Sequence, residues 1–136
     1  MIYEYDLTVA AASTQAAPST ARLSLSHGII HRLEVSYPPG CHNLVSVVLR
    51  RGVHQVWPTN PGGALRADAY TIALPVWEPL EEAPYELQMD GWAPLATYDH
   101  TITVRLGILP REVLAPTDKS APLLQRISTL IFGRGS

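Results

Sequence analysis

Five histidines are the residues of this chain whose chemistry is easiest to test against a known kind of site. They are His27, His31, His42, His54 and His100. A zinc ion needs three or four converging ligands, with short spacings between some of them. His27 and His31 are suitably spaced, but Gly28 lies between them. His31 and His100 fall in phase with apolar neighbours, which favours buried, hydrogen-bonded histidines. We therefore expect no metal and no cofactor.

Cys41 and His42 are adjacent, which raises the question of a thiolate–imidazole pair. Neighbouring residues on a strand point to opposite faces, and a nucleophile needs a base within hydrogen-bond reach. Cys41 is the only cysteine, so no intrachain disulfide can form. The carboxylates Glu81 and Glu82 stand in a proline-flanked turn, whereas a glycosidase needs two carboxylates facing across a cleft. We predict that the protein is not an enzyme. An enzyme of unknown type remains an alternative that only scattered His, Asp and Cys residues favour.

Three tryptophans, Trp57, Trp77 and Trp92, each stand near a predicted turn. Tryptophan rings at the rim of a β-sandwich could stack on sugar rings, which makes these three residues a candidate ligand rim. A carbohydrate- or ligand-binding module is therefore the alternative function. The simpler interpretation is that the three rings close the ends of the sandwich.

The elements that would carry these residues are predicted to be strands. Apolar and polar residues alternate with the period of a half-buried strand. The densest apolar content lies in a hairpin at 44–57, where Gly52 supplies the positive φ of the turn. Twelve prolines separate the apolar runs, which is typical of a protein with many turns. The strands are expected at 2–9, 22–26, 29–37, 44–57 as a hairpin, 70–77, 85–89 and 101–108.

This pattern predicts an all-β protein, an antiparallel β-sandwich of about seven or eight strands with a jelly-roll-like arrangement. We expect one domain over residues 1–110, with 10–21 as an extended loop or arm and Asp90–Gly91 as a turn. Pro75 should lie in an edge strand or a bulge. The expected core residues are Leu33, Val35, Val45, Val47, Leu49, Ile72, Leu74, Ile102, Val104 and Leu106.

The C-terminal part has a different pattern. Residues 111–119 are predicted to be a linker, and 120–133 a short amphipathic α-helix that Ser120 begins and Gly133 ends. A helix of about three turns is marginal alone in water, so its apolar stripe must pack on its own sandwich or on another chain. We expect it to make the contacts of a homo-oligomer. The stripe consists of Leu123, Leu124, Ile127, Leu130 and Ile131.

Charge and hydropathy narrow the range of partners. The net charge is −2 and no basic stripe is present, so we expect no nucleic-acid partner. No apolar run approaches the length that spans a membrane, and the N-terminal stretch alternates like a strand. We therefore expect no membrane partner and no secretion signal.

The segments HRLEVSYPPGCHNLVSVVLRRGVHQVWPTNP and YDHTITVRLGILP, with the long Pro/Gly loops and the C-terminal tail, suggest a family. The chain resembles small all-β structural proteins of viruses and tailed phages, particularly capsid decoration or cement proteins. The resemblance covers most of the chain as architecture. It implies a non-enzymatic protein that forms a homo-oligomer, preferably a trimer, and binds a major capsid or other shell protein. Its expected location is the virion, or the host cytoplasm before assembly.

Overall fold

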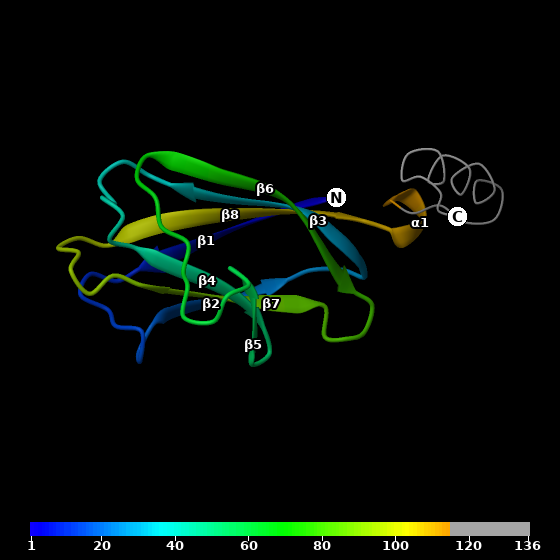
Figure 1. Ribbon diagram of the computed structural model, residues 1–136, viewed down its shortest axis with the longest axis horizontal. Coiled ribbons are helices and arrows are strands. Elements are labelled where there is room, and N and C mark those ends of the chain that lie inside the picture. The colour runs from blue at the N-terminus through cyan, green and yellow to red at the C-terminus, as the bar shows by residue number, and fades with distance from the viewer. Residues whose placement is uncertain (115–136) are drawn as a thin grey trace, which may run out of the picture.

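Two antiparallel four-stranded sheets pack face to face in the computed structural model, which describes residues 1–114 (Figure 1). The first sheet has the order β1 (Ile2–Val9), β8 (His100–Leu109), β3 (Gly28–Tyr37) and β6 (Tyr70–Leu80). The second has the order β2 (Ser19–Ser24), β7 (Glu86–Trp92), β4 (Ser46–Arg51) and β5 (His54–Trp57). A short helix, α1 (Arg111–Leu114), follows β8. The predicted all-β sandwich is confirmed.

The strand pairing identifies the topology. β1 pairs with β8, β2 with β7, β3 with β6 and β4 with β5, all antiparallel. Eight strands paired from the outside inward, then wrapped into two sheets, form a jelly roll. The central hairpin is β4–β5, and Gly52 in its turn has a φ of 62°.

The core lies between the sheets and is formed by the inward faces of both. Most of the predicted core residues are fully buried, namely Leu33, Val35, Val45, Val47, Leu49, Ile102, Val104 and Leu106. Two predictions on β6 are wrong, because Ile72 is only partly buried and Leu74 is 38% exposed. β6 is an edge strand, and the edge strand of the facing sheet, β5, is much shorter. The second sheet therefore cannot cover β6 along its whole length.

Asp90 and Gly91 lie within β7, so the predicted turn there is wrong. A Cβ atom on Gly91 would come within 2.6 Å of Val9 Cγ2 on the opposite sheet. The glycine therefore allows close packing of the two sheets. Pairing of Gly91 with Ser19 of β2 and Val47 of β4 overrides the local turn preference. Pro75 is on an edge strand as predicted, where a missing N–H is tolerated.

The ends of the chain also differ from prediction. The expected arm at 10–21 is shorter, because its last residues from Ser19 onward belong to β2. The first part of the predicted linker is helical: the N–H groups of Val113 and Leu114 donate to the carbonyl of Pro110 and start α1. The rest of that linker, the helix at 120–133 and the stripe Leu123, Leu124, Ile127, Leu130 and Ile131 lie outside the described residues. Within residues 1–114, no helix is long and apolar enough to cross a membrane.

Candidate functional site at the loop end of the sandwich

Four connecting segments, 10–18, 38–45, 93–99 and the end of 58–69, gather at one end of the sandwich. This end, which we call the loop end, is on the left in Figure 1, whereas the N-terminus and α1 lie on the right. The segments are far apart in sequence. They meet because the jelly-roll topology returns alternate strand connections to the same end.

The loop end contains a hollow of about 480 Å³. Two large side chains beside it face solvent, Leu95 with 76% and Tyr98 with 74% of its surface exposed. Within the described part of the chain, no lysine, arginine, aspartate or glutamate lines this hollow. The lining consists of Pro39, Gly40, His42, Leu44, Leu95, Ala96, Thr97, Tyr98 and His100. The hollow is thus mainly apolar, and its titratable groups are His42, His100 and the phenol of Tyr98.

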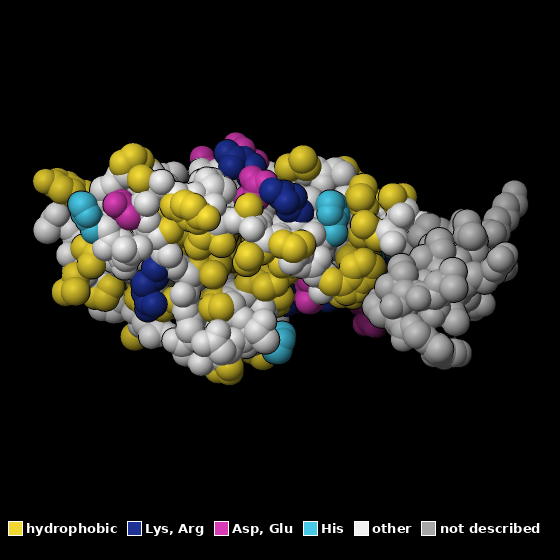
Figure 2. Space-filling model, turned by 45° about the horizontal axis from the view of Figure 1, so that its top comes forward, with side chains coloured by type: hydrophobic (Ala, Val, Ile, Leu, Met, Phe, Trp, Pro, Cys, Tyr) yellow, Lys and Arg dark blue, Asp and Glu magenta, His cyan; other side chains and the backbone are white. Residues whose placement is uncertain are grey.

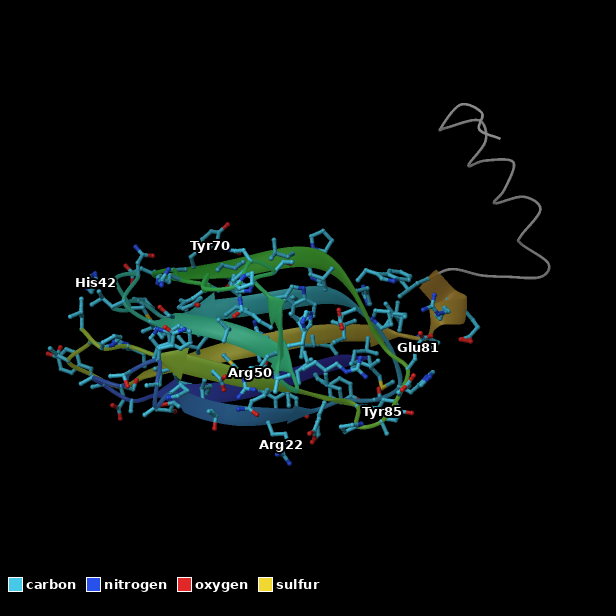
Figure 3. All side chains as sticks on the ribbon, turned by 60° about the horizontal axis from the view of Figure 1, so that its bottom comes forward. Arg22, His42, Arg50, Tyr70, Glu81 and Tyr85 are labelled. Carbon is cyan, nitrogen blue, oxygen red and sulfur yellow. The ribbon has the colours of Figure 1, made fainter. Side chains whose placement is uncertain are left out.

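The first wall of the hollow is a strained loop fixed by Asp68. His42 and Asn43 both have positive φ angles, 51° and 59°, which non-glycine residues adopt at a cost. The backbone N–H groups of Gly40 and His42 each donate to Oδ1 of Asp68, at 3.0 Å. These hydrogen bonds, first the one from His42, hold the pKa of Asp68 below its usual value. Figure 3 shows His42 at this end of the molecule.

The second wall, 93–99, is fixed near both of its ends by the 10–18 segment. The N–H of Ala93 donates to the carbonyl oxygen and to Oγ of Ser13, at 3.2 and 3.1 Å. The N–H of Ala11 donates to Oδ1 of Asp99 at 2.8 Å. Leu95 and Tyr98 therefore project from a segment that is held in place before any partner arrives, which lowers the entropy cost of binding.

Cys41, His42 and Asp68 are close together and have the residue types of a catalytic triad. Their arrangement is that of a structural loop. Cys41 is buried, whereas His42 is exposed, with its Nδ1 4.0 Å from Oδ2 of Asp68. Burial, and then the negative charge of Asp68, raise the pKa of the Cys41 thiol. A reactive cysteine needs the opposite shift, toward the thiolate.

The five histidines do not gather at one site: His42 and His100 line the loop-end hollow, and His31 lies on the outer face of the first sheet. His31 and His100 are half-buried, so the expectation of burial holds only in part. Among residues 1–114, no three His, Cys, Asp or Glu side chains come together in a way that could hold a metal ion.

The three tryptophans do not share one rim. Trp57 on β5 and Trp92 on β7 are buried, and Trp77 on β6 of the other sheet is half-exposed. The guanidinium carbon of Arg111 lies 6.0 Å from the centroid of the Trp77 ring system. Sugar stacking at these residues stays a prediction, for which Trp77 offers the most exposed ring of the three, with Arg111 over it.

Sequence reasoning did not select Leu95 or Tyr98 as site residues. The sequence feature that could have indicated them is the segment 93–99, which contains large apolar side chains but lacks the alternation of a strand. It also missed the buried carboxylate of Asp90 on the outer face of the second sheet. That carboxylate accepts hydrogen bonds from Arg50 Nε at 2.6 Å and from Gln88 Nε2 at 3.0 Å. Figure 3 shows Arg50 on this face.

Comparison of the chain with protein-family models, with curated proteins and with solved structures found no match.

Proposed function

We propose that this protein is a non-enzymatic structural protein of a virus or phage particle, which decorates or cements the shell. In this proposal the loop end docks onto the major capsid protein or another shell protein. The observation that carries it is the pair Leu95 and Tyr98, both about three-quarters exposed on a segment held by hydrogen bonds beside an apolar hollow.

Single exposed apolar residues are common, but two on one fixed segment next to a hollow have the character of an interaction surface. Tyrosine is enriched among the residues that dominate binding energy at protein interfaces. Because no described lysine, arginine, aspartate or glutamate lines the hollow, a partner that fits it presents a neutral, apolar projection. Jelly rolls recur in viral capsid and lectin domains, which supports the proposal by analogy.

Self-association is part of the proposal. We expect a homo-oligomer, with a trimer preferred, as the resemblance to decoration proteins implies. The apolar stripe of 120–133 is the contact expected from the sequence, and it lies outside the described residues. The proposed location is the virion, or the host cell cytoplasm before assembly.

The test is to compare the double variant Leu95→Ser, Tyr98→Ser with Val53→Ser. Val53 is a fully exposed apolar residue at the tip of the β4–β5 hairpin and is the matched control. Particles are purified on a density gradient, and the ratio of this chain to shell protein is measured by quantitative mass spectrometry.

The wild type and Val53→Ser should be found in the particle fraction at a fixed ratio. The double variant should be lost from that fraction, with its melting temperature unchanged because both side chains are exposed. Absence of the wild-type chain from particles, or equal retention of the double variant, would contradict the proposal.

A carbohydrate-binding module is the second candidate, and the exposed ring of Trp77 is the observation in its favour. Binding on a glycan array that is lost in Trp77→Ala, and kept when Leu95 and Tyr98 are replaced, would support this candidate instead.

A further inference from the structure

A second hollow, of about 400 Å³, lies on the outer face of the first sheet over β1, β8 and β3. We call it the sheet-face hollow. Figure 2 shows charged side chains and a histidine in a row on the surface, with hydrophobic side chains beside them. The residues that matter for its binding properties are Ile2, His31, Arg32, Arg105, Gly107 and Leu109.

A bulge and a glycine shape the floor of the sheet-face hollow. The register of β3 shifts between Ile30 and Arg32, so His31 occupies a β-bulge. Opposite the bulge, a Cβ atom on Gly107 would lie 3.1 Å from Nε2 of His31. Bulges re-aim side chains, and here the absence of a side chain at position 107 leaves room for the re-aimed imidazole.

The charged side chains of this face are already paired with one another. Arg32 Nε is 2.9 Å from Oε2 of Glu34, and Arg105 Nε is 2.8 Å from Oε1 of Glu4. The apolar side chain of Ile2, in contrast, is not covered by the rest of the described chain, because 78% of its surface is exposed. A segment that binds here is therefore stabilised mainly by burying aliphatic side chains, and not by adding charge.

The chain itself contains such a segment. Residues 120–133 include five aliphatic side chains at helical spacing, and they follow the last described residue, Leu114. The segment between Leu114 and Leu123 spans about 30 Å at most when extended, so the stripe can reach this hollow on its own copy or on an adjacent one. Leu109, the last residue of β8, lines this hollow, and α1 follows directly. The hollow is therefore close to the last described residues of the chain.

Contacts with the β6 side of the sheet fix the position of α1. Arg111 makes two hydrogen bonds to the Glu81 carboxylate, at 2.9 and 3.1 Å, and lies over Trp77 of β6. Figure 3 shows α1 beside Glu81. β6 is the edge strand opposite β1, which carries Ile2. The anchored helix therefore begins the tail at the far edge of the sheet from the exposed Ile2 side chain. A span of about 30 Å crosses the roughly 14 Å between the edge strands, so the tail reaches its own hollow as well as a neighbour's. The homo-oligomer of the proposed function selects the neighbour.

We propose that residues 120–133 of one copy dock in the sheet-face hollow of the next copy. The contact joins two different surfaces, so it repeats from copy to copy and closes into a ring when the rotation allows. In a closed trimeric ring, every hollow holds the tail of one neighbour and no tail is left without a hollow. The inference rests on the self-association included in the proposed function, and it names the acceptor surface.

Two complementary variants test it in the full-length chain. Ile2→Arg blocks the hollow at an exposed position, and Ile127→Asp blocks the tail, with Val53→Arg as the matched control. Masses are measured by size-exclusion chromatography with light scattering. The wild type and the control should be trimers, and each single variant a monomer. An equimolar mixture should give a 1:1 pair and nothing larger, because Ile127→Asp supplies an intact hollow and Ile2→Arg an intact tail.

Persistence of the trimer in Ile2→Arg would overturn the proposal in favour of tail-to-tail contact. A monomeric wild type, or a mixture that stays monomeric, would also overturn it. The Leu95→Ser, Tyr98→Ser double variant separates this inference from docking on the shell. It should keep the trimer mass while losing the particle, so one proposal can fail without the other.

Discussion

At the scale of single residues, the carboxylate of Asp68 fixes the strained backbone at His42 and Asn43 by accepting two backbone N–H groups. Asp68→Ala should lower the melting temperature at pH 7, and Asp68→Asn, which keeps an acceptor oxygen, should lower it less. Thermal unfolding followed by circular dichroism measures both. A melting temperature identical to that of the wild type in Asp68→Ala would contradict this role.

The same residue predicts a pH dependence. The pKa of Asp68 is lower in the folded protein than in the unfolded chain. Its stabilising contribution is therefore complete above the unfolded value of about 4 and is lost as the pH falls through the lower folded value. The stability difference between the wild type and Asp68→Ala should shrink below about pH 4. A difference that stays constant from pH 7 to pH 2.5 would exclude this linkage.

Asp90 and Glu86, on the same strand, form ion pairs that differ in burial. Asp90 is nearly buried, with its carboxylate 2.6 Å from Arg50, whereas Glu86 and Arg22 are 3.6 Å apart on an open surface. Asp90→Ala should cost about 1.5–3 kcal/mol in urea unfolding, because it leaves a partly buried guanidinium unpaired. Glu86→Ala should cost about 0–1 kcal/mol. Equal costs would show that burial does not decide the strength of these pairs.

At the scale of elements, the packing of β7 against β1 depends on Gly91. A side chain there would meet Val9, so Gly91→Ala should destabilise the protein by about 1–3 kcal/mol. Val9→Ala in the Gly91→Ala background should recover part of that loss, because it removes the clashing methyl groups. Chemical unfolding of the four proteins forms a double-mutant cycle. Simple additivity of the two costs would argue against contact between the two positions.

The elements also show what the sequence could predict. Period-2 alternation identified β1, β3 and β8, and Gly52 identified the hairpin, because these signals are local. The continuation of β7 through Asp90 and Gly91 was missed, since it follows from pairing with β2 and β4, which are distant in sequence. The loop end was missed for the same reason: its four segments meet through the strand topology, and no local pattern reports that.

At the scale of the whole molecule, the fold is predicted to be held by its apolar core alone. The single cysteine is buried, and among residues 1–114 no three His, Cys, Asp or Glu side chains are grouped as metal ligands. EDTA and dithiothreitol should therefore leave the melting temperature unchanged. A decrease of several degrees with EDTA, restored by added zinc, would reveal a metal site that holds the fold.

The two proposed surfaces have different positions on the molecule. The loop end is formed by connecting segments at one end of the sandwich. The sheet-face hollow lies on the outer face of the first sheet, toward the end that carries α1. A protein that contacts the shell through the first and a neighbouring copy through the second would tie shell subunits together. These two contacts are what the proposed cementing function requires.

Photo-crosslinking on intact particles shows whether the loop end contacts the shell. A benzophenone amino acid replaces Tyr98 in one protein and Val53 in another, and particles carrying each are irradiated. We expect a crosslink between position 98 and the shell protein, and none from position 53. Equal crosslinking from both positions, or none from position 98 in particles that contain the chain, would contradict docking through the loop end.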